Sequence, residues 1–279
     1  MSESLSILVD PVFAQPFFTG LIFAILLPLV GAYLRLRDEW LAALALAQTA
    51  AAGALLAMLA GGPLLLGGFL AGLAAAGLKH GVDEAARGVQ GATYALLLVA
   101  AWALAILLVA NHPLAERLGH ALFDGQLYFT GRDHLIVAGL CIVVAGAVLR
   151  HLSRDLLLGH FFPDLFRARG RSARRTHLAF DLVVAVVLAQ ATMSIGVMAA
   201  FAMIFVPPLV AWRWAGSWRR SLWLAALVGV AAYLLAFVLA LAGDQPFGPV
   251  LGLVLVAAAL FSLCMPARSC GGDAAMPGK

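Results

Sequence analysis

The chain has 279 residues, of which 63% are hydrophobic and 11% are charged, and its mean hydropathy is +1.00. Soluble globular chains are about 45–50% apolar and about 25% charged. A water-soluble enzyme, a disordered protein and a nucleic-acid binder therefore fit this composition poorly. The formal net charge of +4 is better explained by basic residues that orient a membrane protein than by nucleic-acid binding. We expect a polytopic membrane protein.

Long apolar runs without strand-like alternation predict membrane-spanning helices, because a helix needs about 20 apolar residues to cross the hydrocarbon. The nine predicted spans are residues 16–35, 40–60, 62–79, 89–111, 134–150, 178–195, 196–212, 221–242 and 248–267. The stretch 178–212 leaves a choice open, because Gly196 and Pro207-Pro208 fit either two crossings or one broken helix. The second choice would give eight spans. Either way, the prediction is an all-α transmembrane bundle with a single domain, 1–279.

The positions of Lys and Arg predict the orientation of the bundle. If the segment after the fifth span is cytoplasmic, all Lys and Arg residues except Arg117 and Arg132 lie on the cytoplasmic side, which is the usual bias of membrane proteins. The N-terminus is then outside and the C-terminus is in the cytoplasm. We expect a multi-pass protein of the inner (plasma) membrane. An eight-span arrangement would disturb this alternation.

Few ionisable groups enter the predicted spans, and Asp181 is the clear exception. The sequence contains no HExxH, paired-aspartate or GxSxG motif, so we expect neither a catalytic site nor a cofactor. Five polar side chains within the spans are candidates for a translocation pathway: Gln48, Thr49, Gln190, Thr192 and Ser194. They would either form interhelical hydrogen bonds or line a wetted path. The last three directly precede Gly196, where a helix break would free backbone carbonyls.

The segment 151–177 is basic and partly amphipathic. Pro163 can open a short helix over 163–169, since its missing N–H is not needed in the first turn. Asp164 then lies in that turn, where the helix dipole favours it, and Gly170 can end the helix. The apolar face would consist of Phe161, Phe162, Leu165 and Phe166. Such a helix would either lie on anionic lipid or dock a cytoplasmic partner.

This segment resembles a loop of known permeases. Residues 160–170 read HFFPDLFRARG and are similar to the loop Phe-Asp-Pro-Glu-x-Ala-x-x-x-Gly of the zinc/manganese-type ABC importer permeases. Pro163, Asp164 and Gly170 match, and Phe166 occupies the alanine position. Further matches follow the family's order at residues 83–88, 122–133, 195–211 and 244–248, so the resemblance covers about residues 16–265.

The resemblance implies a transport subunit without its own catalytic site, which imports zinc, manganese or a metal chelate. A separate cytoplasmic ABC ATPase would drive it by docking on a coupling helix. The residues of that helix would be Phe162, Pro163, Asp164, Leu165, Phe166 and Gly170. The resemblance also implies an extracytoplasmic metal-binding protein that delivers the metal, and a homodimer of permeases surrounded by membrane lipid.

The second span departs from the family pattern. The family carries Asp and His four residues apart there, and this chain has Leu44 and Gln48. An amide oxygen is a poor zinc ligand, so the family's metal ligands are not carried over. Two alternatives of other classes stay open: a standalone secondary transporter or channel, and a membrane scaffold without transport.

Overall fold

The computed structural model describes residues 11–85, 92–125, 127, 130–168 and 172–265. Within these ranges the regular elements are helices, and no strand occurs. The helices are α2 (Pro11–Leu36), α3 (Trp40–Leu59), α4 (Leu64–Ala85), α5 (Ala92–Asn111), α6 (Pro113–Asp124), α7 (Arg132–Phe161), α8 (Pro163–Ala168), α9 (Ala173–Ile195), α10 (Val197–Trp214), α11 (Trp218–Gly243) and α12 (Phe247–Cys264).

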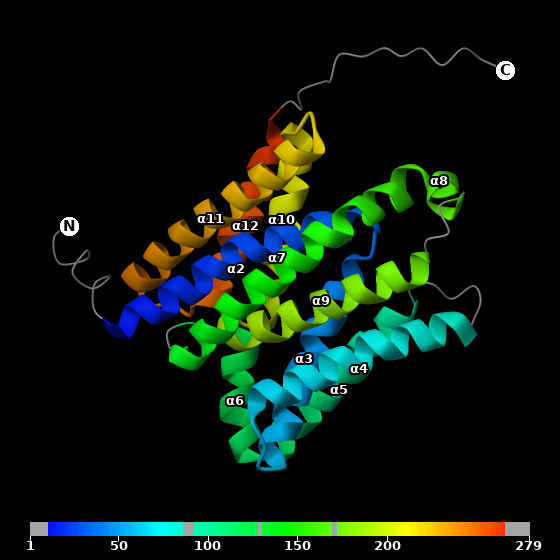
Figure 1. The fold of residues 1–279 in the computed structure, drawn as a ribbon. Helices are drawn as coiled ribbons and strands as arrows, with labels where there is room; N and C mark the ends of the chain where they lie inside the picture. Colours follow the sequence, from blue (N-terminus) through cyan, green and yellow to red (C-terminus); the bar gives the residue numbers. More distant parts are fainter. Residues whose placement is uncertain (1–10, 86–91, 126, 128–129, 169–171, 266–279) are drawn as a thin grey trace.

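The prediction of nine spans is confirmed for the described part of the chain. Nine of its helices, all except α6 and α8, are long and apolar enough to cross a membrane. In Figure 1, α3, α4 and α5 form one group, α2, α10, α11 and α12 form another, and α7 and α9 lie between them. The chain is therefore an all-helical, multi-pass membrane protein.

Gly196 decides between two crossings and one broken helix. Its φ is +90° and its ψ is 160°, a region open essentially to glycine alone, and α9 ends directly before it. The backbone of Gly125, whose φ is +75°, approaches it so closely that a Cβ on either glycine would overlap the other segment. The prediction of two crossings is confirmed, and the turn after α6 lies against the break between α9 and α10.

Helix α7 is longer than the predicted span 134–150. Its 30 residues measure about 45 Å at 1.5 Å per residue, whereas the hydrocarbon is about 30 Å thick. The first charged or titratable side chains after its apolar stretch are Arg150, His151 and Arg154. Helix α7 therefore projects beyond the hydrocarbon at this end and carries α8 with it.

Small residues let the central helices approach closely. Helix α3 packs on α4, α5, α9 and α10. Gly53 and Gly67 face each other between α3 and α4, and Gly68 lies against Met193 of α9. Gly68 and Gly72, which form a GxxxG step, are thus used for packing within one chain, as small residues generally are in membranes.

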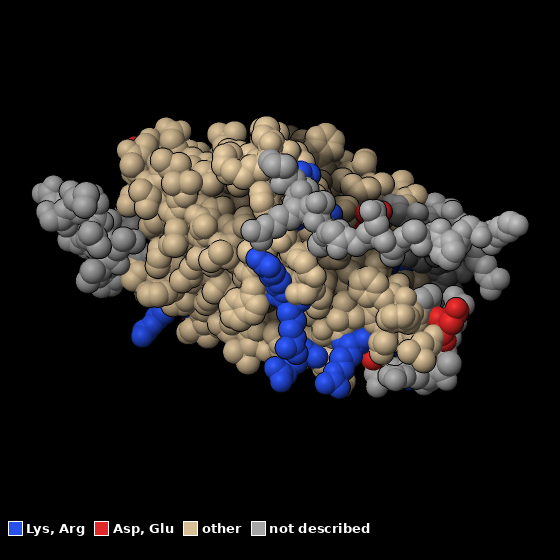
Figure 2. All heavy atoms as spheres, turned by 90° about the horizontal axis from the view of Figure 1, so that it is seen from above, with Lys and Arg blue, Asp and Glu red and all other residues tan. Residues whose placement is uncertain are grey.

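The outer surface is largely apolar. Figure 2 shows a face on which few side chains are acidic or basic, with basic side chains gathered along one edge. Helix α5 exposes Leu96, Val99, Trp102 and Leu107, and α11 exposes Trp223. Such a surface suits lipid or a partner helix and not water.

Candidate coupling segment and translocation pathway

Helix α8 is a short helix held on the projecting end of α7. Phe162 separates the two helices and its N–H donates to the carbonyl of Leu158 at 2.9 Å. The N–H of Phe166 donates to the carbonyl of Phe162 at 3.0 Å, and the side chain of Phe166 is only 4% exposed. Helix α8 packs on α7, and Phe166 supplies a buried side chain of α8.

The other apolar side chains of this region are exposed. Phe161, Phe162 and Leu165 are 53%, 60% and 46% exposed, and together we call them the α8 patch. Asp164 is exposed in the first turn of α8. Gly170, the predicted helix end, lies outside the described residues, and so does residue 169 of the predicted helix. The patch presents three large apolar side chains beyond the membrane-spanning part of α7.

Asp181 lies in a set of charged groups at the same end of the bundle. Its carboxylate is paired with Arg37, and it lies 3.5 Å from Lys79 Nζ and 2.9 Å from His80 Nε2. Glu39 lies 2.7 Å from Arg37 and 3.3 Å from Lys79. We call these five residues the inner ion cluster, after the orientation that the sequence predicts. It joins the α2–α3 link, the end of α4 and the start of α9.

The inner ion cluster is largely buried and its charged groups are paired. Asp181 is 1% exposed and Lys79 is 6% exposed. Burial alone would lower the pKa of the Arg37 guanidinium, but the carboxylates of Asp181 and Glu39 raise it above its ordinary value. The two carboxylates thus face the basic side chains of Arg37, Lys79 and His80, and such pairing is how a buried charged group becomes tolerable. The inner ion cluster therefore holds the α2–α3 link, α4 and α9 together.

The predicted pathway residues lie in the core of the bundle. Gln190 and Thr192 are fully buried and Gln48 is 6% exposed. The oxygen atoms Gln48 Oε1, Gln190 Oε1 and Thr192 Oγ1 have no hydrogen-bond partner among the described residues. They lie on α3 and α9, which are in contact. Buried polar atoms are usually satisfied, so these oxygens are candidates for contact with a passing ligand.

The hydroxyl groups of Thr49 and Ser194 form ordinary hydrogen bonds within their own helices. Thr49 Oγ1 donates to the carbonyl of Ala45 at 2.7 Å, and Ser194 Oγ donates to the carbonyl of Gln190 at 3.0 Å. Both hydroxyls are satisfied within their own helix, as is common for Ser and Thr in helices.

A cavity of about 360 Å³ lies between the first turns of α4 and α7, helix α6 and the last turn of α9. Thr130, Asp133 and His134 supply its polar lining. The Nε2 atom of Gln190 lies 3.3 Å from the carbonyl oxygen of His134 and 3.5 Å from its Nδ1. We call this the outer cavity, after the orientation that the sequence predicts. It lies at the end of the bundle opposite α8 and reaches buried Gln190 through His134.

The outer cavity and the contact between His134 and Gln190 were not predicted from the sequence. No role was assigned to His134, the first residue of the predicted span 134–150, and α6 was not predicted. Pro113 at the start of α6 and Gly125 after its end are the signals that predict such a helix. No signal in a single sequence places residue 134 beside residue 190, because that contact depends on how α7 packs on α9.

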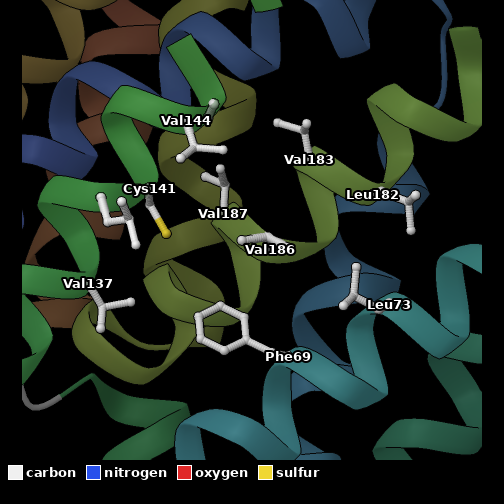
Figure 3. Close-up of a pocket in the computed structure, with 11 residues that line it drawn as sticks. Phe69, Leu73, Val137, Cys141, Val144, Leu182, Val183, Val186 and Val187 are labelled. Atoms are coloured by element: carbon white, nitrogen blue, oxygen red, sulfur yellow. The ribbon is translucent and has the colours of Figure 1, made fainter. Parts of the chain in front are cut away.

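A second cavity, of about 410 Å³, is apolar and is no route for an ion (Figure 3). Side chains of α4, α7 and α9 line it, among them Phe69, Leu73, Val144 and Val186. The thiol of Cys141 is the only heteroatom-bearing side chain in its lining. Moving a hydrated cation through such walls would carry a large desolvation penalty.

In the described part of the chain, nine apolar helices, a short helix outside them and sparse polar groups in the core are the architecture of a multi-pass membrane protein. The chain belongs to the ABC 3 transport family, whose sequence model matches residues 10–266. The family predicted from the order of the motifs is confirmed.

Relatives of similar sequence have names that refer to metal transport. The chain is 25% identical over 250 residues to the manganese transport system membrane protein MntC of Halalkalibacterium halodurans, covering 89% of this chain and 85% of the relative. It is 25% identical over 277 residues to the chelated iron transport system membrane protein YfeD of Yersinia pestis, covering 95% and 90%. Neither name refers to zinc.

Among solved structures, the chain is similar to PsaBC from Streptococcus pneumoniae in complex with Fab. The TM-score is 0.83 at 20% sequence identity, over 94% of this chain and 95% of that one. At this identity the likeness concerns the fold alone.

Proposed function

We propose that the chain is the single-domain membrane subunit of an importer for a divalent transition-metal ion or a metal chelate, and that a separate cytoplasmic ABC ATPase drives it. The observation that carries this proposal is the α8 patch. Family membership and the names of the relatives support transport of a metal, and the α8 patch supports the link to an ATPase.

The α8 patch has the properties of a docking surface. Exposed Phe161, Phe162 and Leu165 lie at the tip of a helix that projects from the hydrocarbon. Exposed apolar groups that cluster beyond the membrane typically mark a protein–protein contact. Because α8 follows α7 directly in the chain and packs on it, a displacement of α8 is passed directly to a membrane span. This arrangement suits a mechanism in which ATPase movements drive alternating access.

The cytoplasmic position of α8 is part of the proposal. Arg150, Arg154, Arg174 and Arg175 flank α8, and basic residues next to span ends usually remain in the cytoplasm. The N-terminus is then outside, as predicted, and the outer cavity faces the extracytoplasmic side. There it can receive a metal from a delivery protein.

The proposed pathway begins at the outer cavity and continues along α9. Asp133 and His134 offer a carboxylate and an imidazole, which suit divalent transition metals. Gln190, Thr192 and Gln48 then offer neutral oxygens. A pathway of weak donors releases its cargo readily, whereas a tight site would hold it. A homodimer within lipid completes the proposed assembly.

The test of ATPase docking uses a matched pair of leucines. Leu165 on α8 and Leu114 on α6 are both exposed and lie at opposite ends of the bundle. The full chain is co-expressed with a cytoplasmic ABC ATPase of the same organism, and the complex is captured through a tag on the permease. We expect Leu165→Asp to lower the recovered ATPase at least about tenfold, since it buries a charge in the contact, and Leu114→Asp to leave it unchanged.

Equal recovery of the ATPase from both variants would contradict the docking proposal. Gel filtration of each purified permease checks that both fold. Uptake of Mn²⁺, Fe²⁺ and Zn²⁺ into vesicles containing the reconstituted complex then identifies the metal.

A further inference from the structure

A large groove lies away from the α8 patch and the pathway residues. Its volume is about 930 Å³, and α2, α7 and the start of α11 form its walls. We call it the α2–α7–α11 groove. A hydrogen bond of 2.9 Å between Tyr33 Oη and Ser153 Oγ joins two of its walls. Nothing in transport or ATPase docking requires this groove.

The groove has an apolar part and a basic part. The apolar part is lined by Leu26, Leu29, Ile142, Leu149 and Leu222. The basic part is lined by Arg150, Arg154 and Arg219. These arginines are exposed and form no hydrogen bond or ion pair with another described residue. No acidic side chain is among the groove's described lining residues, so the three positive charges are not neutralised from within it.

The spacing of the two parts matches one leaflet of a bilayer. Ile142 is the first lining residue on α7, and Arg150 and Arg154 follow 8 and 12 residues later. At 1.5 Å per residue, the arginines lie about 12 and about 18 Å along the helix from Ile142. The hydrocarbon of one leaflet is about 15 Å thick, half of the full core. A lipid chain that reaches Ile142 would therefore place its headgroup between the two arginines.

Trp218 places an aromatic ring in the lining at the headgroup level. Its ring packs edge-on against Tyr33 with centroids 5.0 Å apart, and it lines the groove beside Arg219. Its indole N–H is buried and has no hydrogen-bond partner among the described residues. Tryptophan is enriched where a membrane meets water, since its ring is apolar and its N–H is polar.

We propose that the α2–α7–α11 groove binds one anionic two-chain phospholipid, with its acyl chains on the apolar part and its phosphate among Arg150, Arg154 and Arg219. A zwitterionic lipid would leave part of the positive charge unmatched. The span of a second protein copy would fill the apolar part without using the arginines. Only the choice of leaflet depends on the orientation proposed above.

The charge test compares two variants with the same change in net charge. Arg150→Gln/Arg154→Gln removes two arginines from the groove, and Arg117→Gln/Arg220→Gln removes two exposed arginines outside its lining. Binding of dioleoyl phosphatidylglycerol and dioleoyl phosphatidylcholine to the purified full chain is measured by native mass spectrometry. At about 1 kcal/mol per basic residue, we expect phosphatidylglycerol to bind about thirtyfold more weakly to the first variant only.

The shape test uses two glycines of α7. A Cβ at Gly146 or at Gly139 meets open space, but only Gly146 lines the groove. Gly146→Leu fills part of the apolar lining, so we expect it to weaken phosphatidylglycerol binding several-fold, whereas Gly139→Leu leaves binding unchanged.

Three results would overturn the proposal. One is wild-type protein that binds phosphatidylcholine as tightly as phosphatidylglycerol. Another is full competition by glycerol phosphate, which has no acyl chains and would point to an anion site alone. The third is a change of oligomeric state in Arg150→Gln/Arg154→Gln with unchanged lipid binding, which would assign the groove to a second copy of the chain.

Discussion

Asp181 shows how a single carboxylate can hold together segments that are distant in sequence. It pairs with Arg37 from the α2–α3 link and lies near Lys79 and His80 of α4. Asp181→Asn keeps the shape but leaves buried cations with only Glu39 as an acidic partner in the inner ion cluster. We expect a loss of about 3–5 kcal/mol of stability, as for other broken buried pairs. The thermal unfolding midpoint in detergent measures this loss.

The matched control is Asp244→Asn. Asp244 is exposed and has a left-handed backbone conformation, which asparagine also adopts readily. The thermal unfolding midpoint of this variant should therefore stay close to that of the wild type. A fall of equal size in both variants would show that Asp181 contributes no more than a surface charge.

Leu44 and Gln48 permit a gain-of-function test at the scale of two residues. They lie four residues apart on α3, hence on one helix face, at the positions where the family resemblance implies Asp and His. We expect Leu44→Asp/Gln48→His to bind Zn²⁺ at least about tenfold more tightly than the wild type, because carboxylate and imidazole are effective zinc ligands. Calorimetric titration of the purified protein with ZnCl₂ measures this. If the double variant binds no more tightly than Gln48→His alone, the two positions do not share a ligand.

At the scale of helices, the junction of α9 and α10 depends on a glycine for two separate reasons. Gly196 needs a backbone conformation reserved for glycine, and it also needs the space that Gly125 leaves. Gly61 has φ +74° but open space around its Cβ position. We expect Gly61→Ala to lose about 1–2 kcal/mol through backbone strain alone, and Gly196→Ala to lose more than about 3 kcal/mol. Comparing the unfolding midpoints of the two variants separates the cost of backbone strain from the cost of steric overlap with Gly125. Equal losses of stability would show that the contact with Gly125 contributes nothing.

The spans could be predicted from the sequence because crossing a membrane requires about 20 apolar residues, and these runs are long enough to count. The extension of α7 beyond residue 150 could not be predicted from hydropathy, since a helix in water needs no apolar run. Gln190 was recognised as a polar residue within a span, but its contact with His134 depends on tertiary packing. For the same reason, Asp181 stood out in the sequence while its partners Arg37, Lys79 and His80 did not. The short helix α8 was predicted from Pro163 and Asp164, and the start at Pro163 is confirmed.

For the whole molecule, the distribution of basic residues predicts which end faces the cytoplasm. Gly131 precedes α7 at the end with the outer cavity, and Gly216 lies between α10 and α11 at the other end. A Cβ at either position meets open space. In a background without Cys141, Cys264 and Cys270, we expect an impermeant maleimide to label Gly131→Cys in intact spheroplasts. It should label Gly216→Cys only after permeabilisation. The reverse pattern would invert the proposed orientation.

The length of α7 has a mechanical consequence. The helix has no internal proline, and proline is one of the main causes of a sharp kink in a long helix. Phe162 and α8 follow its inner end, and His134 lies in its outermost turn. A tilt of only about 5° about the midpoint of a rod about 45 Å long moves each end by about 2 Å. That displacement would be enough to separate His134 from Gln190. A movement of α8 on one side of the membrane would therefore expose the side-chain amide of Gln190 near the other side, and α7 alone would transmit it.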